Sequence, residues 1–314
     1  MKTFLKYSGL FSLFLFLFCI AFEYSVRQIP NPFSYKRYLL EEKGSGIKHI
    51  VIGSSVALDG IDPACLPDSA YNLAISAQDL RYNKAQLEKY IDCLPNLKSV
   101  IWGIGYHLLW KDNVEEGDHE ELIAYHNIYM DIRFGYNLLH HSEFLSSGYL
   151  SLMKWSKYYL RHEKTMRCDT LGLDYSEELS EKEKDRKKWL RTISKDVIPH
   201  NMTLKDEKTD RLFRSNIQRM NDVAKLCHDR GIMLYIVIPP VYREYYKLTN
   251  NEQLQQMCTA IKDVADQWDN VCWYNYFNDD RFVEDDFFNG NHLTSDVGAK
   301  KFATILRKDI YGME

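Results

Sequence analysis

Residues 48–61 read KHIVIGSSVALDGI, and this stretch decides the fold class. It begins with a short apolar run that ends at Gly53 and is followed by two serines. A short apolar run bounded by glycine is typical of a strand buried on both faces, as in a parallel sheet. Further runs of this kind predict four more strands, at 71–76, 97–105, 232–240 and 270–277.

Segments with helical spacing lie between and after these strands. They are predicted at 83–94, 210–231, 250–268 and 295–310, the last with Ser295 as its N-cap residue. Because strand and helix alternate, the sequence predicts an α/β fold with a doubly wound parallel sheet. We assign residues 47–106 and 207–314 to this domain.

The alternation is interrupted at residues 107–206. This stretch holds aromatic and histidine-containing segments and then a charged run, with no alternation at the period of a strand. We interpret it as a mostly helical insertion after the third strand, which acts as a lid or cap. The charged run is interpreted as a solvated helix face, with a binding role as the alternative.

The N-terminus predicts a membrane anchor. Sixteen uncharged residues, Tyr7–Phe22, lie between Lys6 and Glu23. By the positive-inside rule, Lys2 and Lys6 place the N-terminus in the cytoplasm and the rest of the chain outside. We interpret residues 1–26 as an uncleaved signal anchor in the cytoplasmic membrane, because cleavage requires small residues that the end of the segment lacks. A cleaved signal peptide is the alternative, and residues 27–46 are interpreted as a tether ending in a turn.

Composition narrows the possible partners. The net charge of −4 and the isoelectric point near 6.2 give no reason to expect a nucleic-acid partner. Six of the seven cysteines lie outside the anchor, with irregular spacing that allows about one or two disulfides at most. No Cys/His pattern predicts a zinc site, and no motif indicates another metal or a cofactor.

Two segments that follow predicted strands carry residues able to do chemistry. In open α/β sheets, sites form where the strands end at their carboxyl edge. Ser55 stands at a tight strand-to-helix turn, where its Oγ can point outward and nearby backbone N–H groups can face an oxyanion. His292 follows the fifth strand and can approach that turn. The alternatives are that Ser55 is an ordinary N-cap residue and that His292 has a structural role.

Together these segments resemble the SGNH (GDSL-like) hydrolase superfamily, particularly its membrane-anchored bacterial branch of DltD-like proteins and proteins associated with polysaccharide O-acyl transfer. The family's first block is similar to GSSxxxxGI here, which implies Ser55 as nucleophile. Its last block, DxxHL, is similar to NGNHL at 289–293, with Gly298 and Ala299 behind it, which implies His292 as base. The resemblance covers about residues 47–106 and 207–312 and implies the SGNH/flavodoxin-like fold.

Three positions depart from the family pattern. Ala77 stands near the glycine whose N–H joins the oxyanion hole of the family, and its own N–H can serve there with that of Ser55. His107 is nearest to the family's asparagine, and its ring can donate one hydrogen bond. Asn289 occupies the place of the acid, where its oxygen can orient the imidazole without supplying charge. Asp286, which lies upstream beside Asp285, is the alternative acid. Catalysis by Ser55 and His292 alone, as a dyad without an acid, is a further alternative.

The resemblance and the anchor imply an esterase or O-acyltransferase outside the cytoplasmic membrane. Its expected substrate is an acylated cell-envelope glycan or a lipid-linked acyl compound, with no metal or cofactor required. The alternative is a catalytically inactive SGNH-fold protein that binds a glycan or a protein partner in an envelope-assembly system. Retention of Ser55 and His292 favours the first interpretation, and Asn289 favours the second.

Overall fold

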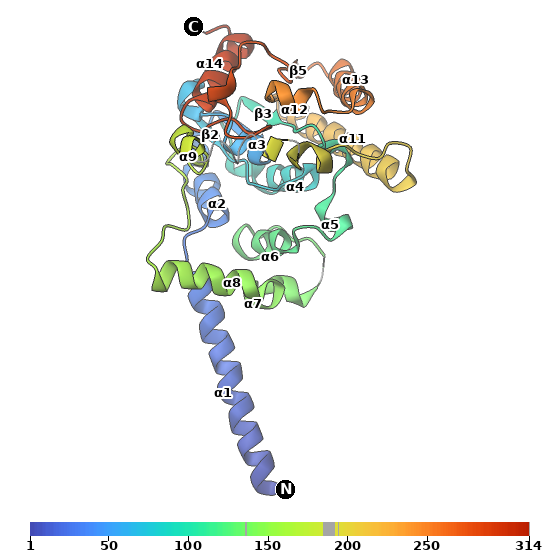
Figure 1. Cartoon of the computed structure of the whole chain (residues 1–314). Helices are drawn as coiled ribbons and strands as arrows, with labels where there is room; N and C mark the ends of the chain where they lie inside the picture. Colours follow the sequence, from blue (N-terminus) through green and yellow to red (C-terminus); the bar gives the residue numbers. More distant parts are fainter. Residues whose placement is uncertain (136, 185–191, 194, 314) are drawn as a thin grey trace. The chain divides into compact units, whose positions relative to one another are not determined.

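The computed structural model describes residues 1–135, 137–184, 192–193 and 195–313 (Figure 1). Internal contacts divide the chain into two compact units. The first comprises Met1–Arg37 and His119–Met166, and the second comprises Tyr38–Asp118 and Arg167–Glu314. Residues 107–206, which the sequence analysis treats as one insertion, therefore contribute to both units.

The second unit contains a five-stranded parallel sheet in the order β2-β1-β3-β4-β5. The strands are β1 His49–Gly53, β2 Ala70–Asn72, β3 Ser99–Gly103, β4 Met233–Ile238 and β5 Val271–Asn275. All residues of β1 and β3 are buried, because helices and loops cover both faces. The prediction of an α/β fold with a parallel sheet is confirmed. Strand β2 is shorter than the predicted 71–76.

Four long helices accompany the sheet. They are α4 Leu80–Tyr90, α11 Glu207–His228, α13 Asn251–Gln267 and α14 Gly298–Tyr311. Asp79, Asp206 and Asn250 cap the first three through side-chain oxygens that accept backbone N–H groups. The prediction that Ser295 caps the last helix is wrong. The Thr294 Oγ1 accepts the Gly298 N–H at 2.9 Å, while the Ser295 N–H donates to the Glu177 carbonyl.

Short elements complete the second unit. They are η1 Gly44–Gly46, α3 Ser55–Leu58, η2 Pro63–Cys65, η3 Ile91–Cys93, η4 Leu108–Trp110, α5 Asn113–Glu116, α9 Leu179–Lys184, η7 Ile198–His200, α12 Arg243–Tyr246 and η8 Glu284–Asp286. Two backbone bonds attach the segment after Arg167 to this unit. The Asn72 N–H donates to the Leu171 carbonyl at 2.8 Å, and the Ser295 N–H donates to the Glu177 carbonyl at 2.9 Å.

The first unit is helical throughout its described elements. It contains α1 Lys2–Arg27, α6 Glu120–Tyr129, η5 Leu138–His141, α7 Glu143–Ser146, α8 Gly148–Trp155 and the π-helical turn η6 Ser156–Leu160. By length and composition, α1 is the one helix of the described residues that is able to cross a membrane. Most of its surface is exposed, and its large apolar side chains have few partners within the described residues.

The stretch 27–46 contains a helix that the sequence analysis did not predict, α2 Pro32–Lys43. Pro32 stands at its first position, where the missing N–H costs nothing. Phe33, Leu39 and Leu40 are buried, which explains why this stretch is ordered into a helix. The seven cysteines, which all lie in the described ranges, form no disulfide bond with one another.

Candidate functional site

Ser55 lies at a close turn between β1 and α3. Gly53 adopts a φ of 146°, Ser54 is extended, and Ser55 is the first residue of α3. A Cβ atom on Gly103 would lie 2.7 Å from the Cβ of Ala57, and one on Gly53 would lie 2.5 Å from the Gly103 carbonyl oxygen. Glycine at both strand ends therefore lets α3 pack directly on the sheet.

The fully buried Asn72 holds the chain after Ser55 in place, and the sequence analysis did not identify it. Its Nδ2 contacts the carbonyl oxygens of Ala57 at 2.7 Å, Leu58 at 3.2 Å and Ile61 at 3.0 Å. Its Oδ1 accepts the Ala74 N–H at 3.0 Å. One amide thus satisfies several backbone groups of the loop that carries the serine.

Replacing Asn72 by alanine is expected to lower the free energy of unfolding by about 3 kcal/mol, because buried carbonyls lose their donor and a cavity remains. Asn96, whose amide contacts the Ser45 carbonyl at the surface, is the matched control. Asn96→Ala is expected to change stability by no more than about 0.5 kcal/mol. Urea unfolding of the two variants measures the difference, and equal losses would contradict this role for Asn72.

His292 reaches Ser55 from a tight loop after β5. The loop is closed by the antiparallel bridge between Phe287 and Leu293 and by the Phe288 N–H, which donates to the His292 carbonyl at 2.9 Å. The His292 Nε2 lies 2.8 Å from the Ser55 Oγ. As whole residues, Ser55 and His292 are half-buried. The structure thus brings the two predicted residues into direct contact.

Asn289 contacts the other side of the imidazole. Its Oδ1 lies 3.0 Å from the His292 Nδ1, 2.9 Å from the His292 backbone N and 3.1 Å from the Asn291 backbone N. The two backbone groups can only donate, so the atom that they face must be the amide oxygen. The same oxygen therefore accepts from Nδ1–H, which leaves the lone pair of Nε2 directed at the Ser55 hydroxyl.

The imidazole of His292 is neutral at neutral pH. Burial, with a smaller contribution from His200, lowers its pKa to about 4. In the described part of the chain no carboxylate contacts the ring, and Asn289 adds no charge that would raise the pKa. A neutral ring with its lone pair on Nε2 is the form that a general base requires.

Asp286, the predicted alternative acid, faces a different partner. Its Oδ2 accepts from the Val283 N–H at 2.8 Å and from the Lys301 ammonium at 2.6 Å. The neighbouring Asp285 is largely exposed and lies 3.8 Å from the Lys182 ammonium. Among the described residues, Asn289 is the one whose side chain contacts the Nδ1 atom of His292.

Two further histidines lie close to His292. The rings of His107 and His200 are stacked, with their centroids 3.9 Å apart and their planes 1° from parallel. Burial lowers the pKa of His200 to about 4, and burial together with His200, Lys111 and His292 lowers the pKa of His107 well below its usual value. The His200 Nδ1 lies 2.7 Å from the Tyr245 hydroxyl. The ring of His107, predicted as a donor to the oxyanion, is thus stacked on His200. The sequence analysis did not identify His200.

Ala77 lies in the loop after β2 in the left-handed region, with a φ of 59°. This conformation favours glycine, so an alanine here is held in place by its surroundings. The loop is held to the end of β1 by the Ile75 N–H, which donates to the Gly53 carbonyl at 3.4 Å, and the Asn113 amide donates to the Ala77 carbonyl at 2.7 Å. Neither the Ser55 N–H nor the Ala77 N–H has an acceptor among the described residues.

No group of three or more His, Cys, Asp or Glu side chains in the described ranges is arranged to hold a metal ion. Comparison with protein families found no family model that matches the chain, and comparison with curated proteins found no match either.

Proposed function

We propose that the chain is a membrane-anchored, extracytoplasmic esterase or O-acyltransferase of the SGNH type. The observation that carries this proposal is the hydrogen-bonded series from Asn289 through His292 to Ser55, in which the amide oxygen determines the tautomer of the ring. The strand order β2-β1-β3-β4-β5 is that of doubly wound, flavodoxin-like sheets and supports the same proposal.

The proposed reaction begins when the Ser55 Oγ attacks the ester carbonyl carbon and its proton passes to the His292 Nε2. The N–H groups of Ser55 and Ala77, which lack acceptors among the described residues, would bind the oxyanion. Collapse breaks the bond to the leaving alkoxide, which takes the proton from Nε2 and leaves an acyl group on Ser55. Water or an acceptor hydroxyl then attacks this ester and gives its proton to Nε2, which returns it to Ser55.

The substrate class and location are proposed from the anchor. Lys2 and Lys6 precede the apolar helix α1, and from them we propose that the N-terminus is cytoplasmic and the second unit lies outside. An enzyme held there would act on acylated cell-envelope glycans or on lipid-linked acyl donors. The alternative of a non-catalytic protein that binds a glycan or an assembly partner predicts no ester turnover.

Hydrolysis of an aryl acetate by the purified chain in detergent, followed as a function of pH, tests this proposal. The base is active when His292 is neutral, so kcat/KM is expected to stay high below pH 6.5 and to fall near pH 4. His107 and His200 lie near His292, and their pKa values are lowered as well. The pKa read from the rate profile therefore belongs to the three histidines together. Absence of ester turnover favours the alternative of a non-catalytic binding protein. A fall in kcat/KM already near pH 6.5 would contradict the lowered pKa of His292.

The same pKa values predict how stability depends on pH. His292 and His200 both have a pKa of about 4 in the folded chain, below the ordinary value near 6.5. Between these values the unfolded chain binds more protons than the folded one, so stability is expected to fall as the pH decreases from 6.5 to 4. The pH profile must therefore be recorded with a parallel measurement of folding.

A further inference from the structure

The segment from Ser142 to Leu160 packs against the C-terminal end of α1, within the first unit (Figure 1). The ring of Phe22 lies 5.3 Å from that of Phe144 and 6.0 Å from that of Trp155. The Trp155 Nε1 donates to the Ser25 Oγ at 2.9 Å. These contacts attach α7 and α8 to the last turns of the apolar helix.

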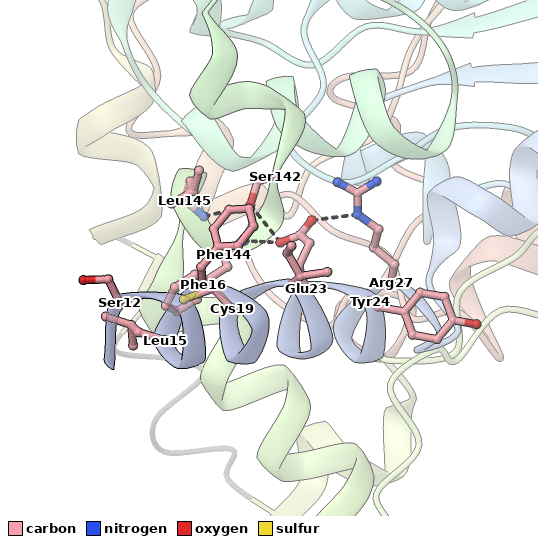
Figure 2. A pocket seen from close by; sticks show the side chains of 11 residues that line it. Ser12, Leu15, Phe16, Cys19, Glu23, Tyr24, Arg27, Ser142, Phe144 and Leu145 are labelled. Carbon is pink, nitrogen blue, oxygen red and sulfur yellow. Dashed lines mark hydrogen bonds and ion pairs between the residues drawn. The ribbon is translucent and has the colours of Figure 1, made fainter. Parts of the chain in front are cut away.

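Glu23 fixes the position of α7 along α1. Its carboxylate accepts from the Ser142 Oγ at 2.8 Å and from the backbone N–H groups of Glu143 at 3.1 Å and Phe144 at 3.0 Å (Figure 2). Glu23 also pairs with Arg27 at 2.7 Å. These bonds hold the start of α7 level with Glu23, at the end of the apolar residues of α1.

The outward face of this segment is apolar. Leu145, Tyr149, Leu152 and Leu160 are 60%, 74%, 51% and 65% exposed. Leu145 belongs to α7, and Tyr149, Leu152 and Leu160 follow in α8 and η6; we call these four residues the outer stripe. Large exposed apolar side chains gathered in one short segment indicate a binding surface.

A groove lies between α1 and α7, and Leu145 of the outer stripe lines it. It has a volume of about 650 Å³ and is lined mainly by apolar side chains, among them Phe16, Cys19 and Ile20 of α1 and Phe144 and Leu145 of α7 (Figure 2). The α1 residues of this groove are Ser12, Leu15, Phe16, Cys19 and Ile20 from the apolar stretch, and Glu23, Tyr24 and Arg27 beyond its end. If α1 crosses the bilayer, Phe144 and Leu145 therefore lie where its apolar stretch meets Glu23 and Arg27, at the boundary between hydrocarbon and head groups.

The length of α1 places its far end at the membrane surface. Its 26 residues span about 39 Å, which exceeds the roughly 30 Å of a hydrocarbon core. Trp155 and Tyr159 lie at this end, as aromatic residues do at membrane interfaces. Lys157 is exposed beside them and suits anionic head groups.

We propose that α7, α8 and η6 form an interfacial element that lies in the outer leaflet, with the outer stripe facing acyl chains and a phospholipid chain in the groove. This inference rests on the proposed anchoring of the chain by α1. The lipid bilayer is the occupant that the observations favour, because the stripe continues the lipid-facing surface of α1.

Depth-dependent quenching tests the inference in the full chain. A coumarin amino acid placed at Leu152, or separately at Tyr149, is read in vesicles of phosphatidylcholine and phosphatidylglycerol that contain nitroxide-labelled phosphatidylcholine. Both positions are more than half exposed, so the label is tolerated. The matched control is the same label at Glu120, an exposed acidic position of α6 in the same unit. Resistance to alkaline carbonate extraction reports separately whether α1 is inserted.

The expected result is loss of most coumarin emission at Leu152 and Tyr149 and little loss at Glu120, in carbonate-resistant protein. Unquenched emission at both stripe positions in carbonate-resistant protein overturns the interfacial element while the anchor stands. Blue-shifted but unquenched emission means that protein, such as a second copy, covers the stripe, and this also overturns it. Extraction by carbonate overturns the anchor and this inference together.

Discussion

Replacing Ser55 with alanine is expected to lower kcat/KM for an aryl ester by roughly 10⁶-fold, the loss found when a serine nucleophile acting with a histidine is removed. The Oγ of Ser55 is the atom that would form the acyl intermediate, and it lies 2.8 Å from the His292 Nε2. The side chain is partly exposed, so the variant is expected to fold normally. Steady-state hydrolysis and circular dichroism measure the two effects.

The neighbouring serine provides the control for that substitution. Ser54 is buried, and its side chain does not cap α3. Ser54→Ala makes the same chemical change one residue away, and we expect it to alter kcat/KM by no more than a few-fold. Loss of turnover in Ser54→Ala, with activity retained in Ser55→Ala, would show that the nucleophile is assigned to the wrong residue.

Replacing Asn289 with leucine is expected to lower kcat/KM by up to roughly 10⁴-fold, the loss seen when the tautomer of a triad histidine is no longer controlled. Leucine has a similar size but no acceptor, so the His292 Nδ1–H loses its partner together with two backbone N–H groups. The rate of hydrolysis at pH 7, compared at equal folded fraction, measures this effect.

Asn289→Asp is the conservative counterpart of that variant. A carboxylate would accept the same three donors and would also favour the imidazolium, so the pKa of His292 is expected to rise from about 4. Activity is retained and the acidic limb of the pH profile moves to higher pH. A leucine variant as active as the original chain, or an aspartate variant with an unmoved limb, would contradict the positioning role of Asn289.

Local sequence signals were sufficient to predict the sheet. The buried strands at Ile50–Ile52 and Val100–Trp102 are continuous apolar runs, which identify strands in a parallel sheet without reference to their neighbours. The placement of Ser55 and His292 followed from the rule that strand ends share one edge. Where the prediction failed, as at Ser295, a neighbouring threonine in the folded loop provided the cap.

Other features of the site depend on three-dimensional contacts. Asn72 is one asparagine among many in the sequence, and its importance lies in carbonyl groups more than ten residues away. His200 comes from the segment between the third and fourth strands, which matches no motif, and meets His107 only in the fold. The orientation of the Asn289 amide depends on two backbone donors in a loop whose conformation the residue types alone do not determine.

Covalent labelling with a fluorophosphonate tests the central claim most directly, that Ser55 is a nucleophile activated by His292. The full chain in detergent is treated with the probe, and mass spectrometry locates the modified peptide. Labelling at Ser55 that is lost in Ser55→Ala and strongly slowed in Asn289→Leu is the result that we predict. No labelling of the folded chain, or labelling that persists in Ser55→Ala, would contradict it.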